Sequence, residues 1–262
     1  MKNILIISVI LIVVLAGFYF FGYKTETKDS NNADMLSGNG SLRIKSEEIN
    51  YFKNINGFLA RPESDGPYPG IVMIHEWWGL NENIKDMAQE LAKEGYAVLA
   101  VDLFGKVATT SDEARTQVSS LNQDLALSNL RAATAYLRNE GVEKIASLGW
   151  CFGGGQSLQL SLSGEELSAT VIYYGQLTSD EKQLSMIHWP VLGIFGEEDQ
   201  SIKVETVNDF ENTLNGLGKT NDIYIYPAVG HAFANPSGTN YAPEETKDAW
   251  AKTLTFLAAN LK

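Results

Sequence analysis

Short apolar runs alternate with amphipathic runs along most of this chain, and this alternation limits its possible folds more than any other feature. Runs of four or five residues that are apolar on both faces are typical of strands buried on both sides of a parallel sheet. These runs are residues 71–74, 97–101, 145–148, 169–173, 191–195 and 223–226. Between them apolar residues recur with a helical period, as at Ile84, Met87 and Leu91. We therefore expect an α/β fold, with a mostly parallel central sheet flanked by helices on both faces.

A hairpin is expected before this pattern begins. Residues 54–57 read Asn-Ile-Asn-Gly and offer turn chemistry between two candidate strands, 49–52 and 58–60. In sheets of the predicted kind, ligands bind at the carboxyl ends of the strands. Polar or reactive residues that directly follow an apolar run are therefore the candidates for chemistry.

The amino-terminal residues predict a membrane anchor. Residues 4–21 are 18 consecutive uncharged positions, which as a helix span about 27 Å, close to the roughly 30 Å hydrocarbon core of a bilayer. We expect an uncleaved anchor over 1–22, a flexible polar tether over 23–41, and one domain over 42–262 outside the cytoplasm. The alternative is a cleaved signal peptide and a secreted protein, which the bulky rings at 18–21 disfavour.

A candidate nucleophile follows the third apolar run. Residues 148–155 read Leu-Gly-Trp-Cys-Phe-Gly-Gly-Gly, with glycines two before and two after Cys151. This spacing is typical of a sharp strand-to-helix turn that exposes a nucleophile, here with sulfur in place of the usual serine oxygen. The N–H of Phe152 would then face a developing oxyanion. The alternative is a small buried cysteine in a glycine-rich packing turn.

A cysteine nucleophile needs a base, and the chain has three histidines. In this architecture the order is nucleophile, acid, histidine, and only His231 follows a predicted strand at the right place. His188 precedes a strand and is interpreted as structural. The acid should follow the run 191–195, where Asp199 is our choice and Glu197 and Glu198 are alternatives.

A second unusual segment follows the first apolar run of the sheet. Residues 74–79 read Ile-His-Glu-Trp-Trp-Gly, where the second oxyanion donor is expected, and the N–H of Trp77 could supply it. Glu76 is placed to take the thiol proton in a dry pocket. The alternative is that Trp77 and Trp78 are packing aromatics and that Glu76 is a rim charge.

Charge and cysteine content exclude several classes of function. The chain carries 32 Asp and Glu against 20 Lys and Arg, for a net charge of −12. Such an acidic chain repels phosphate backbones, so no nucleic acid partner is expected. The single cysteine excludes an intrachain disulfide and a multi-cysteine metal site.

Five motifs in register resemble the dienelactone hydrolase family, a branch of the α/β-hydrolases. They are His-Glu-Trp-Trp-Gly at 75–79, Val-Asp-Leu-Phe-Gly at 101–105, Gly-Trp-Cys-Phe-Gly-Gly at 149–154, Gly-Glu-Glu-Asp at 196–199 and Gly-His-Ala-Phe at 230–233. The resemblance covers about 210 residues from residue 50 onward. It implies the α/β-hydrolase fold and hydrolysis of an ester or lactone through an acyl-thiol enzyme, with no metal and no cofactor.

The resemblance also implies roles for individual residues. Cys151, Asp199 and His231 would form the triad, and Glu76 would pair with the Cys151 thiol and take its proton when substrate binds. The N–H groups of Trp77 and Phe152 would form the oxyanion hole.

One departure from the family pattern bears on the substrate. Dienelactone hydrolases proper hold a substrate carboxylate with two arginines, and this chain has Ala-Asn-Pro at 234–236, where one of them lies. Arg115 is the nearest candidate for the other. A neutral ester or lactone packed against Trp77, Trp78 and Trp150 is therefore expected, bound by a monomer. The alternative function is a membrane-tethered ligand-binding protein that keeps the hydrolase fold without catalysis.

Overall fold

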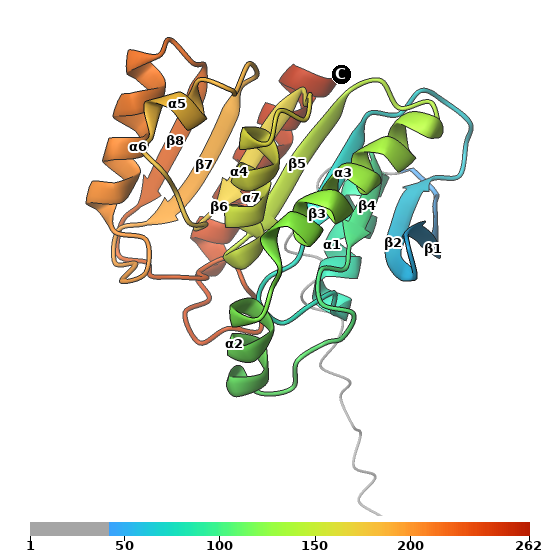
Figure 1. The fold of residues 1–262 in the computed structure, drawn as a ribbon, viewed down its shortest axis with the longest axis horizontal. Coiled ribbons are helices and arrows are strands. Elements are labelled where there is room, and N and C mark those ends of the chain that lie inside the picture. The colour runs from blue at the N-terminus through green and yellow to red at the C-terminus, as the bar shows by residue number, and fades with distance from the viewer. Residues whose placement is uncertain (1–41) are drawn as a thin grey trace, which may run out of the picture.

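The strands assemble into one eight-stranded sheet in the computed structural model, which describes residues 42–262 (Figure 1). The sheet order is β1-β2-β4-β3-β5-β6-β7-β8. β1 and β2 pair antiparallel and β2 pairs antiparallel with β4, whereas all pairs from β4 through β3 to β8 are parallel. The strands are β1 (Ile44–Phe52), β2 (Ile55–Pro62), β3 (Gly70–Ile74), β4 (Ala97–Val101), β5 (Ile145–Trp150), β6 (Ala169–Tyr173), β7 (Val191–Gly196) and β8 (Asn221–Tyr226). The predicted mostly parallel sheet is confirmed.

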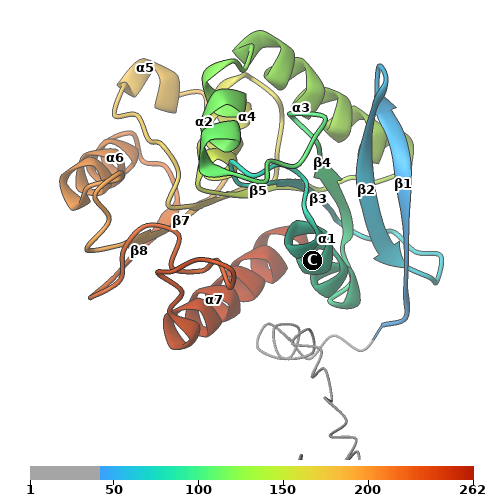
Figure 2. The same cartoon turned by 90° about the horizontal axis from the view of Figure 1, so that it is seen from below.

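Helices cover both faces of this sheet, as expected, and Figure 2 shows the two layers on either side of it. One face packs against α1 (Glu82–Lys93) and α7 (Pro243–Leu261). The other packs against α3 (Gln123–Asn139), α4 (Phe152–Leu162), α5 (Glu181–Leu184) and α6 (Val204–Gly216). The remaining helix, α2 (Ser111–Ser119), lies below the sheet in Figure 1, after the loop that leaves β4.

The central strands are buried on both faces because each contributes alternate side chains to the two cores. Every residue of β3, β4, β5, β6 and β7 is buried. The strand β8 differs from the prediction, since alternate residues along it are exposed. It lies at the edge of the sheet, where only one face is fully covered.

The hairpin forms, but its turn lies earlier than the sequence predicts. The turn is Lys53-Asn54, with Lys53 in the left-handed region at φ +50°. Asn56 and Gly57 belong to β2 instead, and Gly57 pairs with Ile49. A Cβ at Gly57 would lie 2.8 Å from the Ala100 carbonyl oxygen, so this glycine allows β4 to approach and does not form the turn.

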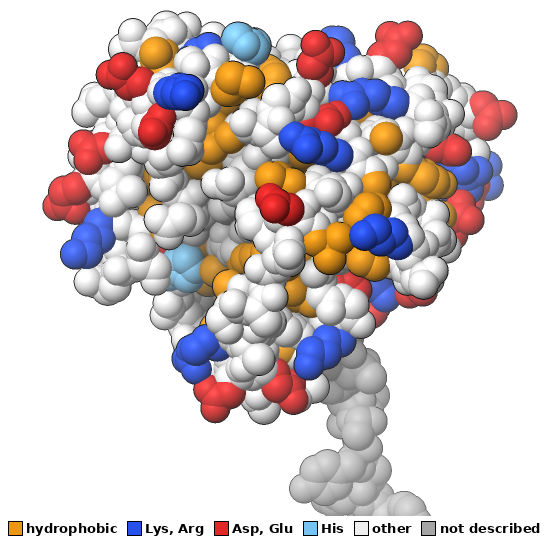
Figure 3. All heavy atoms as spheres, in the orientation of Figure 1, with side chains coloured by type: hydrophobic (Ala, Val, Ile, Leu, Met, Phe, Trp, Pro, Cys, Tyr) orange, Lys and Arg blue, Asp and Glu red, His pale blue; other side chains and the backbone are white. Residues whose placement is uncertain are grey.

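The predicted anchor and tether, residues 1–22 and 23–41, lie outside the described residues. Within 42–262 no helix is both long and apolar enough to cross a bilayer. On the face drawn in Figure 3, Lys, Arg, Asp and Glu side chains are scattered among uncharged groups.

Candidate active site

The turn between β5 and α4 carries Cys151 in a strained conformation. Cys151 has φ +52° and ψ −116°, a region that L-residues rarely adopt. Two glycines make this turn possible. A Cβ at Gly149 would lie 2.2 Å from the Gly153 carbonyl oxygen, and one at Gly153 would lie 2.3 Å from the Ile74 carbonyl oxygen. The predicted sharp turn is therefore present, and it projects Cys151 at the amino end of α4.

The structure brings Cys151, His231 and Asp199 together from three loops. His231 Nε2 lies 3.0 Å from Cys151 Sγ, and His231 Nδ1 lies 2.7 Å from Asp199 Oδ2. The other carboxylate oxygen of Asp199 accepts hydrogen bonds from the N–H groups of Ser201 at 2.7 Å and Ile202 at 3.0 Å. Asp199 is therefore held from one side and orients the imidazole from the other.

The pKa shifts of the histidine and the aspartate favour a charged pair. Burial alone lowers the pKa of His231, but its hydrogen bonds to Asp199 and Cys151 outweigh that and raise the pKa to about 10. Burial alone raises the pKa of Asp199, but the hydrogen bond from His231 and those from the backbone bring it below its usual value. At neutral pH the arrangement thus favours an imidazolium that donates from Nδ1 to the carboxylate and from Nε2 to Sγ.

Glu76 is buried at the end of β3 and binds a residue that the sequence did not single out as a partner. Its Oε2 accepts a hydrogen bond from Asn235 Nδ2, and the pairing with the Cys151 thiol expected from the resemblance is not observed. The thiol is instead engaged by His231. Burial raises the pKa of Glu76 to about 7, although the attraction of His231 and the Asn235 hydrogen bond oppose that shift. Glu76 can therefore change its charge near neutral pH.

The two expected oxyanion donors lie on backbone segments that touch one another. The Trp77 N–H donates to no protein oxygen within residues 42–262. Phe152 is the first residue of α4, where helical N–H groups have no partner in their own helix. Because Gly153 has no side chain, this helix end reaches the carbonyl groups of Ile74 and His75.

A family model described as the dienelactone hydrolase family matches residues 55–261. The chain belongs to the dienelactone hydrolase family. It is accordingly a hydrolase that acts on ester or lactone bonds, and its fold is the α/β-hydrolase fold.

Relatives from distant organisms agree with this membership. Proteins named "Putative carboxymethylenebutenolidase" are 30% identical over 243 residues in Saccharolobus solfataricus and 32% identical over 216 residues in Methylorubrum extorquens. These matches cover 78% and 76% of this chain, and 93% and 74% of the relatives. The crystal structure of a "Putative Dienelactone Hydrolase" from Klebsiella pneumoniae superposes with a TM-score of 0.76 at 26% identity, covering 82% of this chain and 99% of that one.

The aromatic residues proposed to bind substrate lie in different surroundings. Trp77 and Trp78 are partly exposed and pack edge to face with ring centres 5.0 Å apart. Trp150 is 2% exposed and packs against Tyr173 in the core beneath α1 and α7. Its predicted role in substrate binding is therefore corrected, because a side chain at the end of a central strand points into the core.

The arginine considered as a carboxylate ligand is engaged elsewhere. Arg115 Nη1 lies 2.7 Å from Asp112 Oδ1 on the exposed surface of α2. Asn235, in the segment 234–236 where one family arginine is expected, binds the buried Glu76. His188, interpreted from the sequence as structural, is exposed before β7.

Three residues of the site were not predicted from the sequence. Asn235 holds Glu76 from a position 159 residues along the chain. Tyr174 has φ +36° and packs its ring edge to face on His231, with centres 5.3 Å apart. His75 is fully buried and contacts the backbone of the segment that carries Trp77. His75 and Tyr174 had a signal in the sequence, because each is a titratable residue directly after a buried strand.

Proposed function

We propose that this enzyme hydrolyses small neutral esters or lactones through a covalent acyl–cysteine intermediate. The observation that carries the proposal is the row of contacts from Cys151 Sγ to His231 Nε2 at 3.0 Å and from His231 Nδ1 to Asp199 Oδ2 at 2.7 Å. A nucleophile within reach of a base that is itself oriented by a carboxylate is the arrangement that acyl transfer requires.

In the first half of the reaction the Cys151 thiolate attacks the substrate carbonyl carbon. A carbon–sulfur bond forms, and the carbonyl oxygen becomes an oxyanion that accepts from the N–H groups of Trp77 and Phe152. When this intermediate collapses, the bond to the leaving oxygen breaks. The His231 imidazolium gives its Nε2 proton to that oxygen, so an ester releases an alcohol, a lactone opens to a hydroxyl that stays on the acyl group, and a thioester remains in both cases.

In the second half water takes the place of the alcohol. The now neutral His231 accepts a proton from a water molecule as the water oxygen attacks the thioester carbon. The second tetrahedral intermediate uses the same two N–H donors and expels the Cys151 sulfur as thiolate. The acid product leaves, and the thiolate–imidazolium pair is restored.

Glu76 has a supporting role in this proposal. The resemblance implies that it takes the thiol proton, but His231 Nε2 is the hydrogen-bond partner of Sγ in the structure. An ionised Glu76 attracts the His231 imidazolium, and the same attraction lowers the pKa of Glu76. We therefore assign Glu76 to stabilising the charged pair before attack.

Two observations support a neutral substrate. The segment 234–236, where one family arginine is expected, holds no arginine, and its Asn235 amide is already bound to Glu76. An amide does not supply the bidentate, charged partner that a substrate carboxylate needs. The partly exposed Trp77 and Trp78 offer apolar surface instead.

Hydrolysis of a panel of aryl esters and lactones by the full-length protein tests the mechanism. We expect turnover by the wild type, background rates for Cys151→Ala, and a loss of at least 100-fold for His231→Ala. His188→Ala is the matched control, because that imidazole is exposed and lies before β7. Its activity should equal that of the wild type. Rapidly quenched wild type should carry one acyl group on Cys151 by mass spectrometry.

The alternative function, a binding protein without catalysis, predicts a different set of results. It requires no ester turnover by the wild type, and a Cys151 that reacts with iodoacetamide no faster than the thiol of a model peptide. Full activity in Cys151→Ala would refute the nucleophile directly.

The cellular placement is a separate proposal that rests on residues 1–22 alone. Their uncharged run supports an anchor that holds the enzyme on the outer side of the membrane. Mass spectrometry of the mature protein tests it, because an anchor leaves the amino-terminal segment in place and a cleaved signal peptide removes it.

A further inference from the structure

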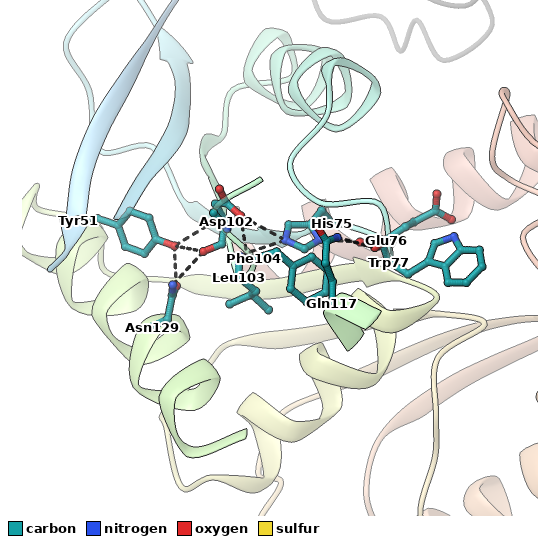
Figure 4. A network of polar contacts seen from close by, with 10 residues as sticks. Tyr51, His75, Glu76, Trp77, Asp102, Leu103, Phe104, Gln117 and Asn129 are labelled. Atoms are coloured by element: carbon teal, nitrogen blue, oxygen red, sulfur yellow. Dashed lines mark hydrogen bonds and ion pairs between the residues drawn. The ribbon is translucent and has the colours of Figure 1, made fainter. Parts of the chain in front are cut away.

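The peptide group between Glu76 and Trp77 carries a proposed oxyanion donor at one end and a carbonyl at the other. In a planar trans peptide the C=O and the N–H point in opposite directions. Any group that holds the Glu76 carbonyl therefore also sets the direction of the Trp77 N–H. Figure 4 shows which group does so: the imidazole of His75 faces the Glu76 carbonyl, while the Glu76 carboxylate is turned away from the ring.

The hydrogen bonds of His75 define its tautomer. The Leu103 N–H lies 3.1 Å from His75 Nε2, and an amide N–H can only donate, so Nε2 carries no proton. The proton is then on Nδ1, which lies 2.6 Å from the Glu76 carbonyl oxygen and donates to it. The side chain is fully buried, and burial lowers the pKa of His75, in agreement with a neutral ring.

The loop after β4 holds the imidazole at Nε2, the ring nitrogen that does not face Glu76. The Asp102 carboxylate accepts from the N–H groups of Phe104 and Gly105, both at 2.9 Å, and so shapes the turn that presents the Leu103 N–H. The Asp102 carbonyl accepts from Asn129 Nδ2 at 3.0 Å. The row of contacts from α3 to the end of β3 leaves His75 one orientation.

His75 also contacts the residue that carries the other oxyanion donor. Its ring is stacked on that of Phe152, with centres 6.0 Å apart, and lies 4.9 Å from that of Phe104. The Glu76 carbonyl oxygen also accepts a second hydrogen bond, from the Gly79 N–H at 3.2 Å. His75 is therefore one of two donors that orient the Glu76–Trp77 peptide, and its loss should misalign that peptide only in part.

We propose that His75 is a positioning residue that aims the Trp77 N–H at the oxyanion by donating from Nδ1 to the Glu76 carbonyl. It touches neither substrate nor Cys151, and it acts through the peptide that it orients. This inference rests on the proposed oxyanion hole and adds to it the group that sets its geometry.

A pair of variants isolates the hydrogen bond from ring packing. The amide nitrogen of Asn can occupy the place of Nδ1, whereas the amide of Gln reaches only the place of Nε2. Both lose the ring, and the two amides divide its contacts: Asn can keep the donor to the Glu76 carbonyl, whereas Gln can keep only the acceptor for the Leu103 N–H. We expect kcat for ester hydrolysis to be about tenfold lower in His75→Gln than in His75→Asn, with KM changed less than threefold.

Two reagents separate the oxyanion hole from the thiol. An aryl trifluoromethyl ketone adds to Cys151 and creates an oxyanion, so its affinity should fall in parallel with kcat. Iodoacetamide alkylates the thiol without an oxyanion, so its rate should be equal in the two variants. His188→Gln is the matched control on an exposed imidazole and should resemble the wild type in all three measurements.

Nitrogen-15 NMR provides a readout that does not depend on turnover. The full-length wild type should show a protonated Nδ1 and an unprotonated Nε2 at His75, and the Trp77 amide resonance should move more in His75→Gln than in His75→Asn. A proton on Nε2, or equal kcat in the two variants, overturns the assignment of His75. If the wild type shows the expected resonances but hydrolyses no ester, the proposed function is rejected while the assignment of the His75 hydrogen bond stands.

Discussion

Glu76 is a carboxyl group that the fold removes almost entirely from water. It is 6% exposed, and burial raises its pKa to about 7 from an ordinary value of 4.5. A folded state that binds a proton more tightly than the unfolded state is stabilised at low pH. The contribution of Glu76 is therefore fully present below about pH 4.5 and is lost as the pH rises through about 7.

Replacing Glu76 by Gln should remove this pH dependence. Relative to Glu76→Gln, the free energy of unfolding of the wild type should fall by about 3 kcal/mol between pH 4.5 and pH 8, because 1.36 kcal/mol corresponds to each pKa unit. Urea unfolding of both proteins at the two pH values measures the difference. Glu198→Gln, at an exposed carboxyl in the loop after β7, is the control for the loss of one negative charge. Parallel pH profiles of wild type and Glu76→Gln would contradict a raised pKa at Glu76.

The close approach of α4 to β3 is the feature of the elements on which the site depends. Gly153 lies in the first turn of α4, and a Cβ there would lie 2.3 Å from the Ile74 carbonyl oxygen and 2.5 Å from that of His75. Both neighbours are backbone atoms of a buried segment, so they cannot rotate away. The helix would have to move, and it carries Phe152 and Cys151 with it.

Gly153→Ala should therefore impair both stability and catalysis. Overpacking of this kind costs about 1–3 kcal/mol, and separation of the two proposed oxyanion donors should lower kcat more than it raises KM. Thermal unfolding and ester kinetics on the same preparation test this. Gly216→Ala in α6 is the matched control, since a Cβ there meets no atom within 4 Å. Equal kcat and melting temperature in Gly153→Ala and the wild type would show that the contact is dispensable.

The sequence predicts the central strands and long helices well because burial on both faces leaves a plain pattern. Prediction from the sequence fails where an element buries few side chains, or where a glycine could serve either a turn or close packing of strands. The helix α2 was not predicted, since it buries only Ala114 and Gln117. The hairpin turn was placed too late because Gly57 serves strand packing.

Two rules predicted the residues that the structure brings together, Cys151, Asp199 and His231. One is the order of nucleophile, acid and histidine along the chain, and the other is that functional residues lie at the carboxyl ends of the strands. The partner of Glu76 could not be predicted, because Asn235 is 159 residues distant and only the assembled sheet brings them together. The same holds for the tautomer of His75, which depends on a backbone N–H from the loop after β4. The order of elements is thus readable from local patterns, whereas individual hydrogen bonds between loops are not.

At the scale of the whole molecule, net charge acts on any substrate before it reaches the site. The chain carries a net charge of −12, and a field of that sign repels anions and lowers their local concentration. Salt screens this repulsion over a Debye length of about 10 Å at 0.1 M. Within the site, the ionised Asp199 adds negative charge and His231 supplies one positive charge, while Glu76 adds negative charge only as the pH rises through about 7.

A matched pair of esters should reveal this field. We expect kcat/KM for an anionic aryl hemisuccinate to be lower than for the neutral aryl acetate at low ionic strength, and to rise several-fold on addition of 0.5 M NaCl. The neutral ester should respond little to salt, because it carries no charge for the field to act on. A salt-dependent preference for the anionic ester would indicate that cationic side chains bind the substrate carboxylate. Arg115 and Asn235 would then have to exchange their present partners, Asp112 and Glu76, for the substrate. The sign of the salt effect therefore decides between a neutral substrate and the carboxylate substrates that family arginines hold.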